Sequence, residues 1–307
     1  MTLMGSLVVA LMLALGGPVP TASSAPAKLT NGCAVGPRGI PSCGAYFGAA
    51  YGANTNPSGW ERSMGRTLGV HRTYWGASQV SSALATARAD NARNRVPWMS
   101  FKAPYSWSQM AAGKGDAWAR GLATKMRSAG GPVWVAIHHE PEGDGDIQVW
   151  KRMQARLAPI MRKAAPNLAY SIILMGYHEF YGESKYRMSK IWPKTKIDIA
   201  GFDLYEKYGV KGITKWKSFN KDYFNPIRAW AKRTGVRWGL AETGYSDPAA
   251  KRNPKWIRAI YNAMRARGGI AFTYFNTNLN SVANWKLSLA TKQNAFTRLN
   301  KVAPKMR

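Results

Sequence analysis

The sequence predicts an α/β protein that folds as a single (β/α)8 barrel, or TIM barrel, and three observations support this prediction. Eight short apolar segments alternate with longer amphipathic segments along residues 45–307. Several of the short segments are apolar on both faces, as parallel strands covered by helices must be. No constant-period repeat, low-complexity linker or second cluster of strands interrupts the alternation, so one barrel accounts for the whole region.

The predicted strands are spaced regularly along the chain. They are Ala45–Tyr51, Gly69–Trp75, Val96–Lys102, Val133–His138, Ala169–Met175, Ile197–Leu204, Arg237–Ala241 and Ile270–Phe275. A doubly wound open sheet is the main alternative, but it would usually carry a glycine-rich phosphate loop after its first strand. The segment from Phe47 to Gly52 lacks the G-x-G-x-x-G spacing of that loop, which favours the barrel.

The segments between the strands have the periodicity of amphipathic helices with basic outer faces. In one of them, apolar residues recur every three or four positions, at Ile147, Trp150, Met153, Leu157, Ile160 and Ala164. Lysines and arginines fall largely on its other faces. Much of the positive charge of the chain therefore lies on solvated helix surfaces.

The first 27 residues have the pattern of a signal peptide. An apolar core from Leu3 to Leu15 is followed by Gly16, Gly17 and Pro18 and then by small residues at 22–25. This core is shorter than the roughly 20 apolar residues that span a bilayer. We expect cleavage near position 25 or 27, no stable membrane span afterwards, and a secreted or cell-wall-associated protein. An uncleaved anchor is the alternative.

Residues 28–44 form a predicted N-terminal segment ahead of a catalytic domain at 45–307. This segment holds both cysteines of the chain, Cys33 and Cys43. A close pair in an exported protein predicts a disulfide, which would fix the entry to the domain. Two thiols alone cannot form a zinc site.

The chain is strongly basic, with 44 Lys and Arg against 15 Asp and Glu and a net charge of +29. Such a charge attracts polyanions, so an acidic cell-wall polymer is a candidate partner of the basic surface. The basic residues are spread over the helices without a recognition motif, which argues against specific nucleic-acid binding. The hydrophobic fraction of 46% excludes a disordered chain.

The polar residues that follow the apolar runs indicate the chemistry, because catalytic groups of such barrels lie at the carboxyl ends of strands. These residues are His138, His139, Glu140, Asp203, Tyr205, Glu242, Tyr274 and Asn276. Buried carboxylates are costly unless they are paired or used. Glu140 and Glu242, on the fourth and seventh strands, can face each other across the barrel. Glycoside hydrolysis with retention needs two carboxyl groups about 5–5.5 Å apart, one protonated and one ionised.

Four segments together resemble glycoside hydrolase family 26. They are Val133–Gly145, Ile199–Tyr205, Trp238–Tyr245 and Asn284–Ser288, and the resemblance runs from about Ala45 to Ser288. The family consists of retaining (β/α)8 hydrolases with glutamates on strands four and seven; its best-known members are endo-β-1,4-mannanases. The resemblance implies hydrolysis of a β-mannan or related β-glycan by double displacement. We expect no cofactor and a monomer.

The resemblance also assigns roles by position. Glu140 would be the acid/base and Glu242 the nucleophile. His139 would hydrogen-bond substrate or nucleophile, and Tyr205 would hydrogen-bond the nucleophile. Candidates for stacking on sugar rings are Trp75, Tyr177, Tyr245 and Tyr274. The family often has a tryptophan on strand eight where this chain has Phe272, Tyr274 and Phe275, so the resemblance implies the reaction better than the sugar.

A metal site is the competing interpretation of the acidic segment 138–146. His138 and His139 are adjacent on a strand and therefore diverge, unlike the paired histidines of a helical H-E-x-x-H motif. The loop also lacks the full calcium-binding pattern. We expect no metal, a packing role for His138, and surface or rim positions for Glu179 and Glu183.

A non-catalytic protein that binds cell-wall or acidic polysaccharide on a hydrolase scaffold is the alternative function. The net charge favours it. The pair Glu140 and Glu242 argues against it, because a binding protein has no need of two buried acids.

Overall fold

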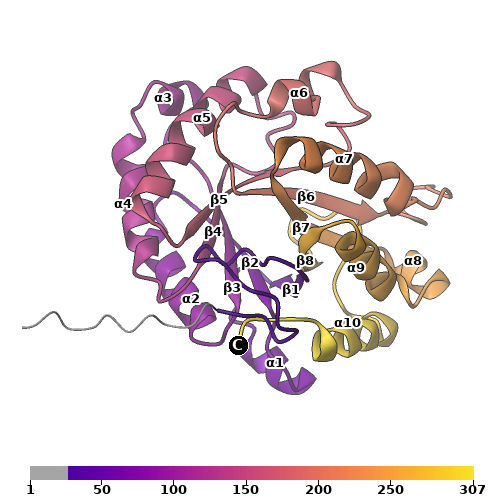
Figure 1. Ribbon diagram of the computed structural model, residues 1–307. Coiled ribbons are helices and arrows are strands. Elements are labelled where there is room, and N and C mark those ends of the chain that lie inside the picture. Colours follow the sequence, from indigo (N-terminus) through magenta and orange to yellow (C-terminus); the bar gives the residue numbers. More distant parts are fainter. Residues whose placement is uncertain (1–26) are drawn as a thin grey trace, which may run out of the picture.

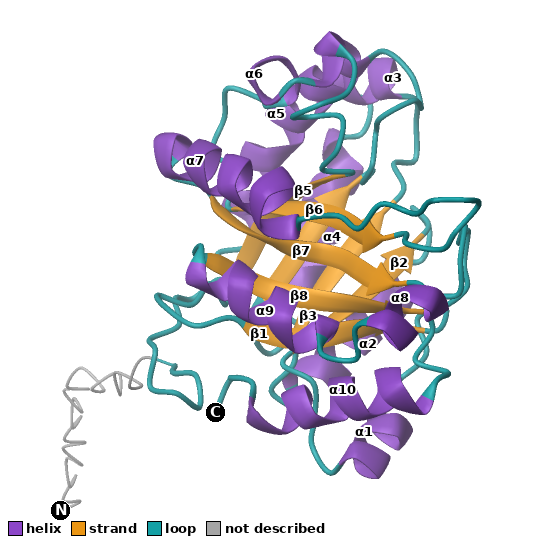
Figure 2. Cartoon of the chain, turned by 90° about the vertical axis from the view of Figure 1, so that its right-hand side faces the viewer, coloured by secondary structure: helices purple, strands orange, loops and turns teal. Residues whose placement is uncertain are grey.

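In a computed structural model, which describes residues 27–307, eight parallel strands form a closed barrel in the order β1 to β8 (Figure 1). The predicted (β/α)8 fold is therefore confirmed. Figure 2 shows the strands inside and the helices around them. The predicted signal peptide lies outside the described residues, apart from its last position. Between residues 27 and 307, no helix is both long and apolar enough to cross a bilayer.

All eight predicted strands are present. The strands are β1 Tyr46–Tyr51, β2 Val70–Trp75, β3 Val96–Phe101, β4 Val133–Ile137, β5 Leu168–Leu174, β6 Ile199–Glu206, β7 Arg237–Tyr245 and β8 Gly269–Asn276. The helices are α1 Ser58–Met64, α2 Val80–Asn91, α3 Trp107–Ala111, α4 Asp116–Arg127, α5 Ile147–Ala164, α6 Met188–Ile191, α7 Asn225–Thr234, α8 Asp247–Arg252, α9 Trp256–Ala266 and α10 Ala290–Val302, with short turns η1 Ser184–Tyr186 and η2 Phe219–Phe224.

The barrel interior is filled by large side chains that pack against small ones. The rings of Trp98 and Trp134 meet edge to face, with centroids 5.1 Å apart. Gly201 makes room for this packing, because a Cβ there would lie 2.9 Å from an atom of the Trp98 ring. A second apolar layer lies between the strands and the helices. The two layers together give the packed core of a barrel rather than a pore.

The seventh strand is longer than predicted. β7 continues to Tyr245, whereas the sequence predicted an end at Ala241. Its backbone stays paired with β6, which itself extends to Glu206. The predicted end was wrong because the apolar run stops at Ala241, while strand pairing depends on backbone hydrogen bonds and not on side-chain polarity.

A β-bulge on β7 directs two consecutive residues into the barrel. Phe202 lies opposite Leu240, but Asp203 lies opposite Glu242, so Ala241 is the extra residue. Ala241 packs in the interior cluster, and Glu242 lines the cavity above it. Regular alternation along a strand would send one of these two side chains to the other face. The bulge therefore positions Glu242.

Residues 28–44 close the amino-terminal end of the barrel. The expected disulfide between Cys33 and Cys43 is present, with Cα atoms 5.4 Å apart. The carbonyl of Arg38 accepts a hydrogen bond from Trp134 Nε1 at 2.8 Å, and the Arg38 guanidinium donates to the first residue of β5 at 2.8 Å. The segment thus covers the end of the barrel opposite the carboxyl ends of the strands.

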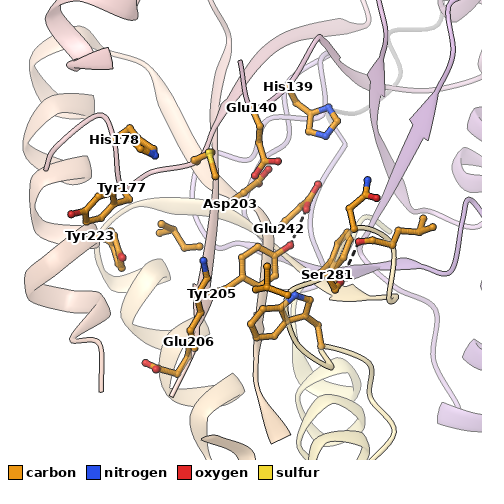
Figure 3. A pocket seen from close by; sticks show the side chains of 18 of the residues that line it. His139, Glu140, Tyr177, His178, Asp203, Tyr205, Glu206, Tyr223, Glu242 and Ser281 are labelled. Carbon is orange, nitrogen blue, oxygen red and sulfur yellow. Dashed lines mark hydrogen bonds between the residues drawn. The ribbon is translucent and has the colours of Figure 1, made fainter. Parts of the chain in front are cut away.

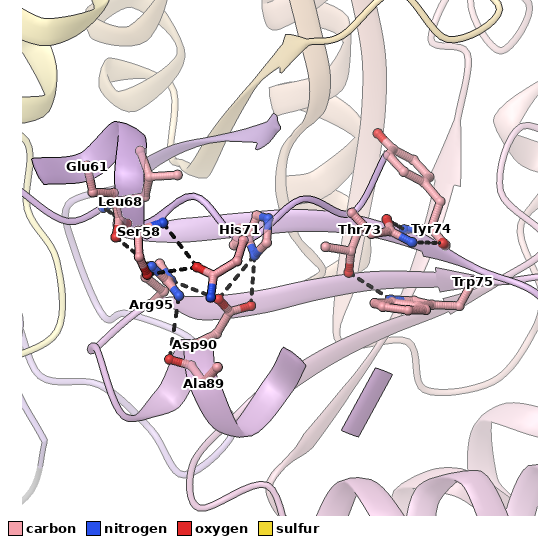
Figure 4. A network of polar contacts seen from close by, with 12 residues as sticks. Ser58, Glu61, Leu68, His71, Thr73, Tyr74, Trp75, Ala89, Asp90 and Arg95 are labelled. Atoms are coloured by element: carbon pink, nitrogen blue, oxygen red, sulfur yellow. Dashed lines mark hydrogen bonds and ion pairs between the residues drawn. The ribbon is translucent and has the colours of Figure 1, made fainter. Parts of the chain in front are cut away.

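A buried polar network ties two helices to the beginnings of β2 and β3 (Figure 4). Arg95 donates to Glu61 at 2.6 Å and to Asp90 at 2.7 Å, and His71 contacts Asp90 at 2.9 Å. These four side chains belong to residues that are at most 3% exposed. Since buried charges are tolerated only when paired, the network is a condition for this part of the fold.

We predict that Arg95→Leu lowers the free energy of unfolding by about 3–5 kcal/mol, because it leaves two buried carboxylates without a cation. Urea denaturation measures the loss. The matched control is Arg156→Leu, which breaks the exposed pair with Asp116 and should cost about 0–1 kcal/mol. Equal losses in the two variants would contradict the structural role of the network.

Candidate active site

A cavity of about 690 Å³ opens at the carboxyl ends of the strands. Its floor carries the three carboxyl groups of Glu140, Asp203 and Glu242, which come from the end of β4, from β6 and from β7. Figure 3 shows these side chains pointing into one space, with His139 and Tyr205 beside them. The structure thus brings together five of the residues predicted for the site, namely Glu140, Glu242, His139, Tyr205 and Tyr177.

The backbone turns sharply where β4 ends. His138 has φ 52° and Glu140 has φ 49°, both in the left-handed region that side chains other than glycine rarely adopt. The Glu140 amide is held there by a hydrogen bond of 3.0 Å to the carbonyl of Ile173 on β5. Left-handed residues cluster at functional sites, where the surroundings enforce them. This turn directs Glu140 into the cavity.

The two adjacent histidines point in different directions. His138 contacts Asp144 at 2.9 Å and meets the ring of Trp107 edge to face, outside the cavity. His139 lines the cavity, with its ring centroid 5.6 Å from that of Tyr74. Burial, followed by the charges of Arg72, His138 and Lys102, lowers the pKa of His139 to about 3. His139 is therefore a neutral imidazole at physiological pH.

Three donors converge on the carboxylate of Glu242. Tyr74 Oη donates to Oε1 at 2.7 Å, Tyr205 Oη donates to Oε2 at 2.8 Å, and Arg72 Nη2 donates to Oε1 at 3.4 Å. Burial, followed by the charge of Glu242, raises the pKa values of both phenols well above their usual range, so both remain donors. The arrangement stabilises the ionised form of Glu242, which is only 5% exposed.

Glu140 has the opposite environment. Burial and the negative charges of Glu242 and Glu142 raise its pKa to about 7, against the opposing charge of Arg72. Glu140 is therefore largely protonated in mildly acidic solution and can donate a proton. The two glutamates of the cavity thus have different surroundings, because Glu242 has three hydrogen-bond donors and Glu140 lies among buried acids.

Asp203 is the third acid of the floor. Burial and the charges of Glu242 and Glu140 raise its pKa well above its usual range. Neither oxygen of Asp203 has a hydrogen-bond partner within the described residues. The surroundings of Asp203 thus favour its neutral form.

Of the four aromatic residues expected to stack on sugar rings, one lines the cavity and three do not. Tyr177 lines the cavity and is 46% exposed. Trp75, Tyr245 and Tyr274 do not line it, because they point into the layer between strands and helices. Tyr245 stacks there on Trp256, with ring centroids 4.7 Å apart. These three residues are therefore left out of the proposed sugar site.

Four side chains around the cavity floor were not predicted from the sequence. Three of them, Tyr74, Phe275 and Trp285, line the cavity beside Tyr205, and Arg72 lies behind Tyr74 with its guanidinium 4.5 Å from the ring centroid. Tyr74 and Phe275 lie next to Trp75 and Tyr274 in the chain, which were predicted instead. Each points to the opposite face of its strand from that neighbour. Both strands are almost completely buried on both faces, so alternation of polar and apolar residues does not identify the face that turns toward the cavity.

A second pair of acids lies beside the floor. Glu142 and Glu179 are close enough for each to influence the pKa of the other, and Glu142 Oε1 accepts from the Met175 amide at 3.1 Å. The other oxygen of Glu142 and both oxygens of Glu179 are buried without a hydrogen-bond partner within the described residues. Glu179 is only 2% exposed, so the expectation of a surface or rim position was wrong. Burial is the main cause that raises the pKa values of both carboxyl groups, so the pair retains a proton where free glutamates would be ionised.

No group of three or more histidine, cysteine, aspartate or glutamate side chains in residues 27–307 is arranged to hold a metal ion. The floor has the chemistry of an acid–base pair, in which one carboxyl group donates a proton and the other carries a charge.

The fold resembles those of glycoside hydrolases. A Cellulomonas fimi endo-β-1,4-mannanase double mutant matches with TM-score 0.59 and 16% identity over 83% of this chain and 70% of that one. A Bacteroides ovatus family 26 β-mannanase matches with TM-score 0.57 and 15% identity over 85% and 89%. A fungal β-1,4-galactanase matches with TM-score 0.61 and 16% identity over 83% and 100%. No family model and no curated protein matches the chain.

We predict that Glu142→Gln stabilises the protein in a pH-dependent way. A carboxyl group whose pKa is raised by folding contributes stability below the pKa of the unfolded chain, and this contribution is lost as pH rises through the folded value. The variant replaces one of the two neighbouring buried acids by an amide that carries no charge at either pH. It should therefore gain about 1–2 kcal/mol over the parent at pH 8 and little at pH 4.

Urea denaturation at the two pH values measures this difference. Glu183→Gln is the matched control, because Glu183 lies in the same loop and pairs with Lys185 at the surface. The prediction is contradicted if Glu183→Gln gives the same gain at pH 8. It is also contradicted if the gain of Glu142→Gln is as large at pH 4 as at pH 8.

Proposed function

We propose that the protein is an exported retaining glycoside hydrolase that cleaves a β-linked polysaccharide, with Glu140 as acid/base and Glu242 as nucleophile. The observation that carries the proposal is the contrast between two acids in one cavity. Glu242 has three donors, and the pKa of Glu140 is raised to about 7. This contrast is what double displacement needs.

In the first step, an oxygen of Glu242 attacks the anomeric carbon as the bond to the leaving oxygen breaks. Glu140 transfers its proton to that oxygen, so the product leaves as an alcohol and the sugar stays bound as an ester of Glu242. In the second step, Glu140 takes a proton from water, whose oxygen attacks the anomeric carbon and releases Glu242. Tyr74, Tyr205 and Arg72 hold the carboxylate in position for both steps.

We propose that the substrate is a β-mannan or a related β-glycan. Support comes from the resemblance of four sequence segments to family 26 and from structural neighbours that include β-mannanases. Phe275 and Trp285 give the cavity an apolar wall against which a sugar ring can pack. The Cys33–Cys43 disulfide is consistent with export, and we propose a secreted or cell-wall-associated location.

The alternative is a non-catalytic binder of acidic polysaccharide, favoured by the net charge of +29. A panel of mannans, mixed-linkage glucans and acidic wall glycans distinguishes the two. Release of reducing sugar supports the enzyme. Salt-sensitive binding without release of sugar supports the binder.

We predict that Glu242→Ala and Glu140→Ala each lower kcat on the cleaved polysaccharide by about 10³-fold or more, while circular dichroism shows both variants folded. Glu183→Gln, at the surface, is the control and should keep parental turnover. Parental turnover in Glu242→Ala would contradict the proposal.

The pH dependence gives an independent prediction. Because Glu140 must be protonated to act as an acid, kcat/KM on the polysaccharide should fall as pH rises above about 7. An aryl glycoside with a strongly acidic phenol as leaving group needs no proton, so its kcat/KM should not fall in that range. The same fall with both substrates would argue against Glu140 as the acid.

A further inference from the structure

A lysine-rich loop borders the cavity. Residues 207–217, which follow β6, contain Lys207, Lys211, Lys215 and Lys217 and no Asp or Glu. All four side chains are exposed. Within residues 27–307, no ion pair involves any of them. The loop therefore presents ammonium groups that form no ion pair within the described residues.

Two of these lysines lie at the cavity itself. Lys207 and Lys217 line it from this loop, and Lys102 lines it from the end of β3. Lys102 is also exposed and without an ion pair, and it borders a second hollow of about 380 Å³. Positive side chains thus come from two separate segments around one opening.

The loop is anchored rather than free. Glu206 Oε1 accepts from the Tyr208 amide at 2.9 Å, and Oε2 accepts from the Lys217 amide at 3.0 Å, so one buried side chain joins both ends of the loop. The ring of Tyr208 packs near that of Trp216, with centroids 5.6 Å apart. The guanidinium of Arg252 donates to Tyr208 Oη at 2.6 Å. The lysines consequently project from a fixed backbone.

The acids of the cavity do not neutralise these lysines. Glu242 is paired with Arg72, and Glu206 is turned toward backbone amides. The pKa of Glu140 is raised to about 7 and that of Asp203 is also raised, so both acids carry less negative charge in mildly acidic solution than free carboxyl groups do. The cavity therefore carries negative charge on its floor, at Glu242, and positive charge at its rim, at the lysines. A ligand that extends from the floor to the rim would contact cations away from the bond that is cleaved.

We propose that the cavity binds a glycan that carries negatively charged substituents, and that Lys207 and Lys217 on one side and Lys102 on the other contact those groups. The inference rests on the proposed function, since it names the substrate class of the same site. Carboxylate and phosphate groups share the chemistry that ammonium groups recognise.

The test compares ligands that differ only in charge. The probes are β-1,4-linked mannohexaose, the β-1,4-linked hexamer of mannuronic acid, and mannohexaose phosphorylated at C6. Calorimetry on the mature protein should give a Kd about tenfold lower for an acidic hexamer than for the neutral one, since each partly exposed ion pair contributes up to a few-fold. Tighter binding of one acidic hexamer identifies carboxylate or phosphate as the group that is recognised.

The variant is Lys207→Gln/Lys217→Gln. Its matched control is Lys163→Gln/Lys232→Gln, which removes the same charge from exposed positions in the last turns of α5 and α7. The ratio of neutral to acidic Kd should fall toward one in the first variant and stay near tenfold in the control. The inference would be overturned if both double variants lowered this ratio equally, or if Lys207→Gln/Lys217→Gln left it unchanged. It would also be overturned if neither acidic hexamer bound.

Hydrolysis is a separate readout. Charge-selective binding that depends on Lys207 and Lys217 but leads to no cleavage would support the inference and count against the proposed function. Cleavage of neutral mannohexaose without preference for an acidic hexamer would support the proposed function and overturn the inference.

Discussion

The charge on Glu242 is the interaction on which the other features of the site depend. Two phenols and a guanidinium hold that charge in a nearly water-free position. Once it is present, like-charge repulsion and burial keep protons on Asp203 and on much of Glu140. One stabilised anion therefore sets the protonation of the whole floor. An apolar pocket with the same acids and no donors would protonate all of them.

Two local departures from regular geometry aim the acids. The bulge in β7 turns Glu242 into the cavity directly after Ala241, and the left-handed turn after β4 does the same for Glu140. Departures of this kind carry a cost that the rest of the structure must offset. The closed sheet and the Arg95 network, at the opposite end, supply rigid surroundings far from the chemistry. Stability and function thus belong to different ends of the barrel.

The sequence predicted the barrel and the pairing of Glu140 with Glu242 in one cavity, because both follow from short-range patterns and from the topology of parallel strands. It missed Tyr74 and chose its neighbour Trp75. That choice requires knowing which face of β2 turns toward the barrel axis. Because β2 is covered on both faces, its polarity pattern does not distinguish them.

The position of Glu179 could not be predicted for a related reason. Charged residues in a loop are usually solvated, and only the fold of two loops against each other brings Glu179 to Glu142. The lysines at 207–217 were visible in the sequence as charge, but the segment gave no sign that Glu206 fixes its ends beside the cavity.

The most direct test of the account is the anomeric configuration of products formed with azide. An aryl β-glycoside of the sugar that the protein releases is supplied to Glu140→Ala and to Glu242→Ala. Azide should restore turnover in both variants. It should give the β-glycosyl azide with Glu140→Ala, where the sugar ester on Glu242 is attacked, and the α-glycosyl azide with Glu242→Ala, where azide replaces the nucleophile. The reverse assignment of anomers, or no glycosyl azide from either variant, would contradict the roles given to the two glutamates.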